Sequence, residues 1–292
     1  MGTSWVDLID MYTFDTGQLS GGIKPWGHYH GVCGLVHRHR PFNLVKPAGA
    51  FLNAEWYIRP GSVAKMVPRE LSRRKLTTHE QIGDDVVIRF PPEPEYGLSL
   101  AVTYSMHDEA IDMRMTIDPT ADVPGFQIFF ASYVCEALGE TWVQLHNPDS
   151  TREWSRLCRS NNRGNTFGVL RDESARSYLS DKYPDLDSSI EVQTRPFDRP
   201  ILVARDSIDG LALVIMCQSG VTPYVMGQYH GYDTAHDWAF GVDLRAGERV
   251  EACARLVCCP LPEVAGMSDT IDELWRTFVE EIGYQESSAS IG

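Results

Sequence analysis

The chain has 292 residues, of which 43% are hydrophobic and 23% are charged, a composition that suits a globular protein with a sizeable core. Its 40 acidic and 26 basic residues give a formal net charge of −14. Nucleic acids and anionic membranes repel an acidic surface of this kind, so neither is expected as a partner.

The start of the chain and its cysteines favour a reducing compartment. Residues 1–7 show no basic region followed by an apolar stretch, so no secretory signal is expected, and no apolar run is long enough to span a membrane. The seven cysteines are scattered, with no Cys-x-x-Cys pair, and most lie in apolar stretches where a free thiol behaves as a small hydrophobic group. A cytoplasmic location is the simplest expectation, although a chain trimmed of its signal would look the same.

Hydrophobic residues recur mainly with a period of two, which predicts half-buried strands. Beyond the His-rich segment near residue 30, strands are expected at 85–90, 98–106, 111–117, 126–135, 201–204, 211–217, 240–244 and 250–259. The short polar link 107–110 predicts a hairpin between two of them, and the turn 245–248 predicts a last hairpin. In this last hairpin the inward-facing residues would be Val250, Ala252, Ala254, Leu256 and Cys258.

Helices are expected to be few. Ser150 and Glu153 form a capping-box pattern that predicts a short helix through Leu157, and 172–183 predicts another. An amphipathic pattern predicts a C-terminal helix at 269–283, with Thr270 and Glu273 as its capping box. A disordered tail is expected at 285–292, and the absence of repeats or linkers predicts a single domain over 1–284.

Sequential strands with few helices predict an all-β fold, a large antiparallel β-sandwich with its site on one concave sheet face and loops around the rim. The chain also resembles the galactose mutarotase-like β-supersandwich group, over roughly 14–260. The resemblance lies in the early His- and Gly-rich strand end, the central Phe-x-x-Phe-Phe-Ala-Ser-Tyr strand at 126–133 and the closing Val-Asp-Leu-Arg-Ala-Gly-Glu-Arg-Val segment at 242–250. It implies a supersandwich fold and carbohydrate as the substrate class. The aldose epimerase motifs (an early Asn-Arg pair, a His-Thr-Tyr-Phe-like motif and a late glutamate) are not recognisable, so the resemblance implies no reaction and no catalytic residues.

Two segments combine histidines, glycines and aromatic residues: Gly-His-Tyr-His-Gly at 27–31, and 228–238, which holds His230 and His236. Residues two apart on a strand share a face, so His28 and His30 would project together. We expect the two segments to form one site.

Sugar sites stack aromatic rings on the apolar face of a pyranose and bond its hydroxyl groups with polar side chains. The candidate substrate-binding residues are Trp26, Trp56, Tyr57, Arg59, His146, Tyr232 and Trp238. Each of these aromatic residues could equally belong to the core. The candidate acid–base residues are His30, Glu55, Glu136, Tyr229 and His230. Both glutamates could instead face outward as partners of arginine.

The His28-x-His30 pattern also fits a divalent metal site for zinc, manganese or iron. A third ligand would come from His230, Asp233, His236 or Glu55. No other cofactor is indicated, and the lack of a glutamate shortly after His30 argues against a cupin site.

The sequence therefore favours a carbohydrate-active enzyme that acts on a sugar or uronate by His/Glu acid–base chemistry, as an epimerase, lyase or hydrolase. The alternatives are a non-catalytic carbohydrate-binding module, a metal-dependent sugar enzyme and a structural protein whose histidines bond the backbone. The expected ligand is a small sugar or an oligosaccharide, and homo-oligomerisation is compatible with the sequence.

Overall fold

A computed structural model describes residues 11–26, 29–47, 49–58, 65–66, 77–93, 97–157, 166–182, 191–230, 233–261, 263 and 266–282. Within these ranges the side chains at 55–58, 65, 66, 91, 93, 166, 182, 229, 230, 233 and 234 are not described.

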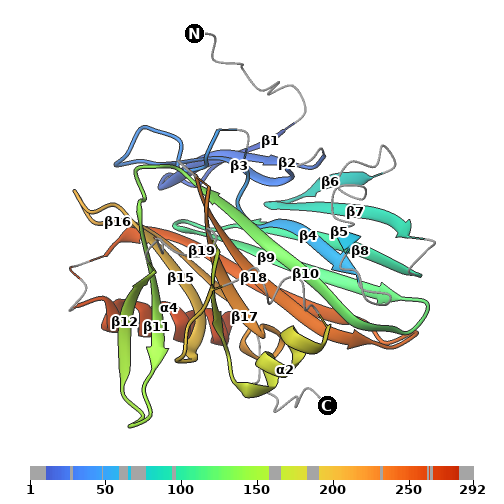
Figure 1. Ribbon diagram of the computed structural model, residues 1–292. Coiled ribbons are helices and arrows are strands. Elements are labelled where there is room, and N and C mark those ends of the chain that lie inside the picture. The colour runs from blue at the N-terminus through green and yellow to red at the C-terminus, as the bar shows by residue number, and fades with distance from the viewer. Residues whose placement is uncertain are drawn as a thin grey trace.

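The described strands form three sheets (Figure 1). The nine-stranded sheet has the order β12 (Arg152–Leu157), β11 (Glu140–His146), β15 (Phe197–Arg205), β16 (Leu211–Cys217), β19 (Val250–Pro260), β9 (Ala110–Pro119), β8 (Leu98–Met106), β7 (Asp85–Glu93) and β6 (Thr78–Ile82). The seven-stranded sheet has the order β14 (Glu191–Val192), β13 (Thr166–Leu170), β17 (Tyr224–His230), β18 (Asp233–Leu244), β10 (Val123–Val134), β4 (Asn53–Ile58) and β5 (Lys65–Met66). The third sheet comprises β1 (Tyr12–Asp15), β2 (Leu19–Lys24) and β3 (Gly31–His37), at the top of the view in Figure 1.

The two large sheets enclose one apolar core, so the fold is the all-β sandwich that the sequence predicts. Strand β8 shows why, because its residues alternate between fully and partly buried and place Leu100, Val102 and Tyr104 inside. From the facing sheet, β10 contributes Phe126 and Phe130 to the same core. The expected hairpin of β8 and β9 and the long central strand β10 are both confirmed.

One helix covers the outer face of each large sheet. The C-terminal helix α4 (Met267–Glu281) packs Ile271, Trp275 and Phe278 against residues of the nine-stranded sheet. Helix α2 (Glu173–Lys182) packs on the seven-stranded sheet, where Tyr178 and Leu179 share a cluster with residues of β10, β17 and β18. Neither of these α-helices is long and apolar enough to cross a membrane.

Three details differ from the sequence-based expectations. The capping-box pattern at Ser150 precedes strand β12 rather than a helix, because residues 152–157 pair with β11. Strands β18 and β19 are consecutive but do not form a hairpin, since β18 pairs with β10 and β17 whereas β19 pairs with β9 and β16. Helix α4 begins at Met267 with Gly266 as its N-cap, one turn before the predicted Thr270 box. The predicted tail at 285–292 lies outside the described residues.

Candidate functional site

The outer face of the seven-stranded sheet carries a buried carboxylate, Asp237 on β18. The strand register places Asn53 of β4, Ala131 of β10, Asp237 and Met226 of β17 in one row across four strands. Residues directly opposite each other on paired strands share a face. Because Met226 packs with α2, this row belongs to the outer face rather than to the core between the sheets.

Alanines lie beside this carboxylate on three sides, and Met226 lies opposite it on β17. Ala235 and Ala239 lie two residues away on either side along β18, and Ala131 lies directly opposite on β10. Even so, only 5% of Asp237 is exposed. Gln228 on β17 donates a hydrogen bond from Nε2 to Oδ2 of Asp237 at 2.6 Å. A hydrogen bond to an ionised acceptor is short and strong, so this amide fixes the direction in which the carboxylate points.

The register brings two predicted acid–base positions to this face. His230 lies two residues beyond Gln228 on β17, and Glu55 lies two residues beyond Asn53 on β4. Glu55 pairs with Phe129, whose side chain packs with α2 on the outer face. The positions of Tyr229 and Trp56 alternate with these and fall on the other face of the sheet.

The first His-rich segment approaches the same end of the seven-stranded sheet. The ring of Tyr29 contacts the ring of Tyr133 on β10 edge to face, at 4.9 Å between centroids, and Tyr133 pairs with Ala235 of β18. The backbone N–H of His30 donates to Oδ1 of Asn53 at 3.2 Å. The structure therefore places residues 29–31 next to the strands that carry Asn53 and Asp237.

The ring of His30 points away from that outer face. It is fully buried, and its centroid lies 5.2 Å from that of Phe90, a core residue on β7 of the opposite sheet. In this arrangement the His30 side chain belongs to the interior of the sandwich, and only its backbone touches the candidate site.

Two residues of the second His-rich segment also face inward. Trp238 is fully buried and donates from Nε1 to the backbone oxygen of Pro200 at 3.2 Å. This placement corrects its assignment as a sugar-stacking platform, because a ring inside the core has no open face. Nε2 of His236 lies 3.0 Å from Oγ1 of Thr141 on β11 of the opposite sheet. Burial lowers the pKa of His236 to about 3, which keeps the ring neutral.

The remaining described candidates lie elsewhere. Glu136 is exposed in the turn after β10, so it does not enter the sheet face as the sequence suggested. Trp26 follows β2 and is partly buried, with Nζ of Lys24 located 4.3 Å from its ring centroid. His28, Arg59 and Tyr232 lie outside the described residues.

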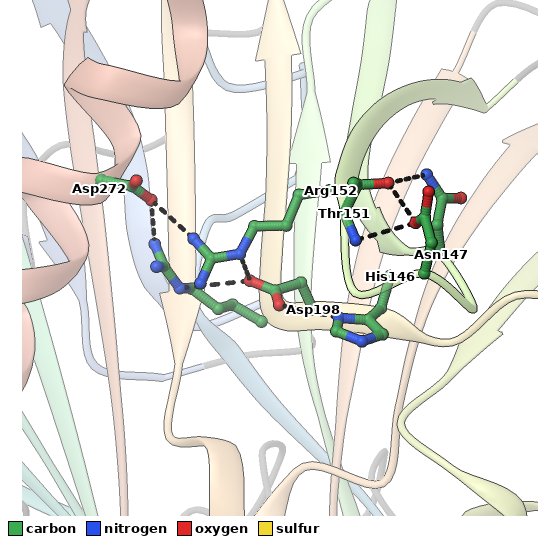
Figure 2. Close-up of polar contacts among 8 residues, drawn as sticks. His146, Asn147, Thr151, Arg152, Asp198 and Asp272 are labelled. Carbon is green, nitrogen blue, oxygen red and sulfur yellow. Dashed lines mark hydrogen bonds and ion pairs between the residues drawn. The ribbon is translucent and has the colours of Figure 1, made fainter.

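His146, at the end of β11, takes part in an ion-pair network on the nine-stranded sheet (Figure 2). Its Nδ1 lies 3.4 Å from Oδ1 of Asp198. The Asp198 carboxylate also pairs with Nε of Arg152 at 3.2 Å, and Arg152 and Arg199 both reach Asp272 on α4. This network links the strands to the C-terminal helix, a structural role for His146.

Sequence analysis did not select Asp237, although a signal was available. Period-two alternation along β18 separates Ala235, Asp237 and Ala239 on one face from His236 and Trp238 on the other. Asp237 is therefore an acidic residue flanked at both i ± 2 positions by alanines. His236 and the predicted site residue Trp238 lie on the opposite face of the strand, toward the core.

The metal hypothesis depends on residues outside the described set or without described side chains, namely His28 and His230. Among the described residues, no three His, Cys, Asp or Glu side chains are grouped closely enough to hold a metal ion.

Searches of family models and of curated proteins find no match to this chain. Solved structures do match. A galactose mutarotase-like protein from Lactobacillus casei has a TM-score of 0.57 and 12% identity, covering 85% of this chain and 100% of that one. A galactose mutarotase related enzyme from Lactobacillus acidophilus has a TM-score of 0.51 and 9% identity, covering 87% of this chain and 99% of that one.

A larger glycosidase matches over part of its length. The α-N-acetylgalactosaminidase of Bifidobacterium bifidum has a TM-score of 0.56 and 13% identity, covering 94% of this chain and 39% of that one. At these identities the similarity establishes the fold alone, and the expected resemblance is confirmed at that level. The chain has the fold of the galactose mutarotase-like proteins.

Proposed function

We propose that this protein is a carbohydrate-active enzyme of the epimerase type, which binds a sugar on the outer face of the seven-stranded sheet and exchanges protons with it. The observation that carries the proposal is the buried Asp237 carboxylate, oriented by Gln228 at 2.6 Å beside alanine side chains. Solved structures with this fold include proteins described as galactose mutarotase-like and as glycosidases, which supports carbohydrate as the substrate class.

The reaction requires two groups that move protons in opposite directions. To interconvert the anomers of an aldose, a base removes the proton of the C1 hydroxyl while an acid protonates the ring oxygen. The bond between C1 and the ring oxygen then breaks, C1 becomes an aldehyde, and the ring closes again after rotation about the C1–C2 bond. We assign the base to Asp237 and the acid to His230, since a carboxylate and an imidazole can exchange protons near neutral pH.

Glu55 is the second carboxylate position on this face, two strands away from β18. We assign it to hydroxyl binding, together with Asn53.

The test is anomer exchange measured by NMR on a panel of free aldoses, with the wild type and the variants Asp237→Asn and His230→Gln. Loss of a positioned acid or base typically costs about 10²- to 10⁴-fold in rate, so each variant should lose at least about 100-fold. Asp243→Asn is the matched control, because Asp243 lies on the same strand but is exposed and accepts a hydrogen bond from the Gly125 N–H at 2.6 Å. The control should keep the wild-type rate.

Full exchange activity in Asp237→Asn, with an unchanged melting temperature, would refute the assignment of the base. If the wild type bound sugars by saturation-transfer NMR but exchanged no anomer in the panel, the protein would instead be a non-catalytic carbohydrate-binding module. Elemental analysis of the wild type and of a His28→Ala/His30→Ala variant tests the metal hypothesis on the same preparations.

A further inference from the structure

We propose that a cavity at the N-terminal end of helix α2 binds a phosphate group. The cavity has a volume of about 270 Å³. Two stretches of chain line it: residues between 170 and 176, from the end of β13 to the first turn of α2, and residues 193–196 after β14. None of its lining residues is assigned to the Asp237 site, and the inference does not depend on the proposed function.

Three arginines line this cavity: Arg171, Arg176 and Arg195. The acidic residues in its lining are Asp172 and Glu173, so the lining carries a formal charge of +1. The whole chain has a formal charge of −14, with 26 basic residues spread over 292 positions. With Glu153, which pairs with Arg195, three guanidinium groups balance three carboxylates around one small cavity. The region is therefore locally neutral in an otherwise acidic protein, which favours an anionic ligand here over the rest of the surface.

Neighbouring groups hold two of these arginines in place. Arg171 donates from Nη1 to the backbone oxygen of Gly220 at 3.2 Å and from Nε to Asp172 at 2.8 Å. Arg195 donates from Nη1 to Oδ1 of Asn147 at 2.7 Å and to Oε2 of Glu153 at 2.6 Å. Because these contacts orient the guanidinium groups before any ligand arrives, binding requires less ordering of side chains.

The contacts of Arg195 with other described residues engage Nη1 alone. A guanidinium has five N–H donors in a rigid fork, so Nε and Nη2 are the donors that this arginine would offer to a ligand. Its Glu153 partner is 56% exposed, and an exposed ion pair contributes little to stability. Glu153 therefore competes weakly with a bound anion.

The carboxylate of Asp172 contacts both Arg171, through Oδ2, and the start of the helix, through Oδ1. Its Oδ1 accepts hydrogen bonds from the Ala175 N–H at 2.8 Å and from the Ser174 hydroxyl at 2.5 Å. These are N-cap contacts that fix the start of the ten-residue helix α2. The helix N-terminus adds a partial positive charge on the same side as the arginines.

A phosphate monoester fits these features better than a neutral ligand. It carries close to two negative charges and three acceptor oxygens, and guanidinium groups bind such oxygens in pairs. The volume lies just below the roughly 300–1,000 Å³ typical of sites for whole drug-sized ligands, so it suits a single small group. Gln193 and Thr194 supply further polar groups in the lining. The group could come from free phosphate or from a phosphorylated sugar.

The test is isothermal titration calorimetry with inorganic phosphate, at constant ionic strength, on the wild type, Arg195→Ala and Arg195→Lys. Phosphate should bind the wild type, and loss of the Arg195 fork should weaken binding about tenfold or more. The lysine variant keeps the positive charge, so its affinity for phosphate should fall less than that of the alanine variant. Arg114→Ala is the matched control, because Arg114 forms a similarly exposed pair with Glu251 on the nine-stranded sheet. It should bind as the wild type does.

Glucose 6-phosphate and glucose, titrated in parallel, distinguish the two sources of the group. Tighter binding of glucose 6-phosphate than of phosphate indicates a phosphorylated sugar, and equal binding indicates the phosphate group alone; either supports the proposal. Absence of phosphate binding to the wild type would overturn it, as would equal binding by the wild type and Arg195→Ala. If Arg195→Ala does not fold, Arg176→Ala on α2 provides the same comparison.

Discussion

The buried histidine His236 should make the stability of this protein fall as the pH falls. Its ring lies inside the sandwich, where Nε2 is 3.0 Å from Oγ1 of Thr141. Burial lowers its pKa from 6.5 to about 3, so the folded protein contains the neutral ring. In the unfolded chain the same ring takes up a proton as the pH falls through 6.5.

The sign and the size of the effect follow from proton linkage. Below pH 6.5 the unfolded state binds one more proton than the folded state at this position, so the free energy of unfolding decreases as the pH decreases. The stability is fully present above pH 6.5 and is lost at about 1.4 kcal/mol per pH unit down to about pH 3. Between about pH 7.5 and about pH 5, His236 alone should cost about 2 kcal/mol.

The assay is urea unfolding, followed by tryptophan fluorescence, on the wild type and His236→Gln at both pH values. Glutamine can still reach the Thr141 hydroxyl but does not titrate. Other groups contribute to the pH dependence of both proteins, so the quantity to compare is the loss between the two pH values in each. This loss should be smaller in the variant by about 2 kcal/mol.

An equal loss in both proteins would refute the reasoning, because it would mean that His236 takes up its proton in the folded state as readily as in the unfolded chain. Above about pH 7.5 the two proteins should show the same slope, since His236 is then neutral in both states. If the free energy of unfolding of the two proteins depended differently on pH above about pH 7.5, the cause would be a change in the fold rather than the titration of His236.

Two further substitutions test the core and the C-terminal helix. Trp238→Phe should destabilise the protein by about 1–2 kcal/mol, because it leaves the carbonyl of Pro200 without its indole donor, yet it should not change sugar binding measured by NMR. An unchanged free energy of unfolding together with weakened sugar binding would contradict the inward placement of this ring. Arg255, 5% exposed, pairs with Asp112 at 2.6 and 2.7 Å and with Glu281 of α4 at 2.6 Å. Arg255→Met should cost about 3 kcal/mol in urea unfolding, and Asp112→Leu in the same chain should recover part of this loss. If Arg255→Met lowers the free energy of unfolding by less than about 1 kcal/mol, the ion pair of Arg255 with Glu281 does not hold α4 to the sheet.

Much of the strand content could be predicted because hydrophobic alternation is a local property. The β8–β9 hairpin follows from two alternating stretches and a four-residue polar link, and the structure confirms its register from Leu98 paired with Pro119 to Met106 paired with Ile111. The same local reasoning failed for β18 and β19, which look like a hairpin in sequence. The two strands belong to different sheets, and one partner of each, β10 for β18 and β9 for β19, lies a hundred or more positions away in the sequence.

The residues after Ser150 show how tertiary packing overrides a local motif. Ser150 and Glu153 match a capping box, but the chain continues as β12, paired with β11. Trp154 of this strand donates from Nε1 to the Ser268 hydroxyl of α4 at 3.2 Å. A capping motif contributes only about 1 kcal/mol, which strand pairing and packing against a helix readily exceed.

The sequence by itself determined the all-β class, the approximate positions of strands β7 to β10, β15, β16, β18 and β19, and the C-terminal amphipathic helix. Only the tertiary structure decided which faces of these strands point into the core between the two large sheets. The side chains of His30, His236 and Trp238 lie in the core, whereas Asp237 lies on the outer face beside Gln228. Alternation along a strand separates two faces, but the layers that pack on each face determine which one is buried against the other sheet and which one can meet a ligand.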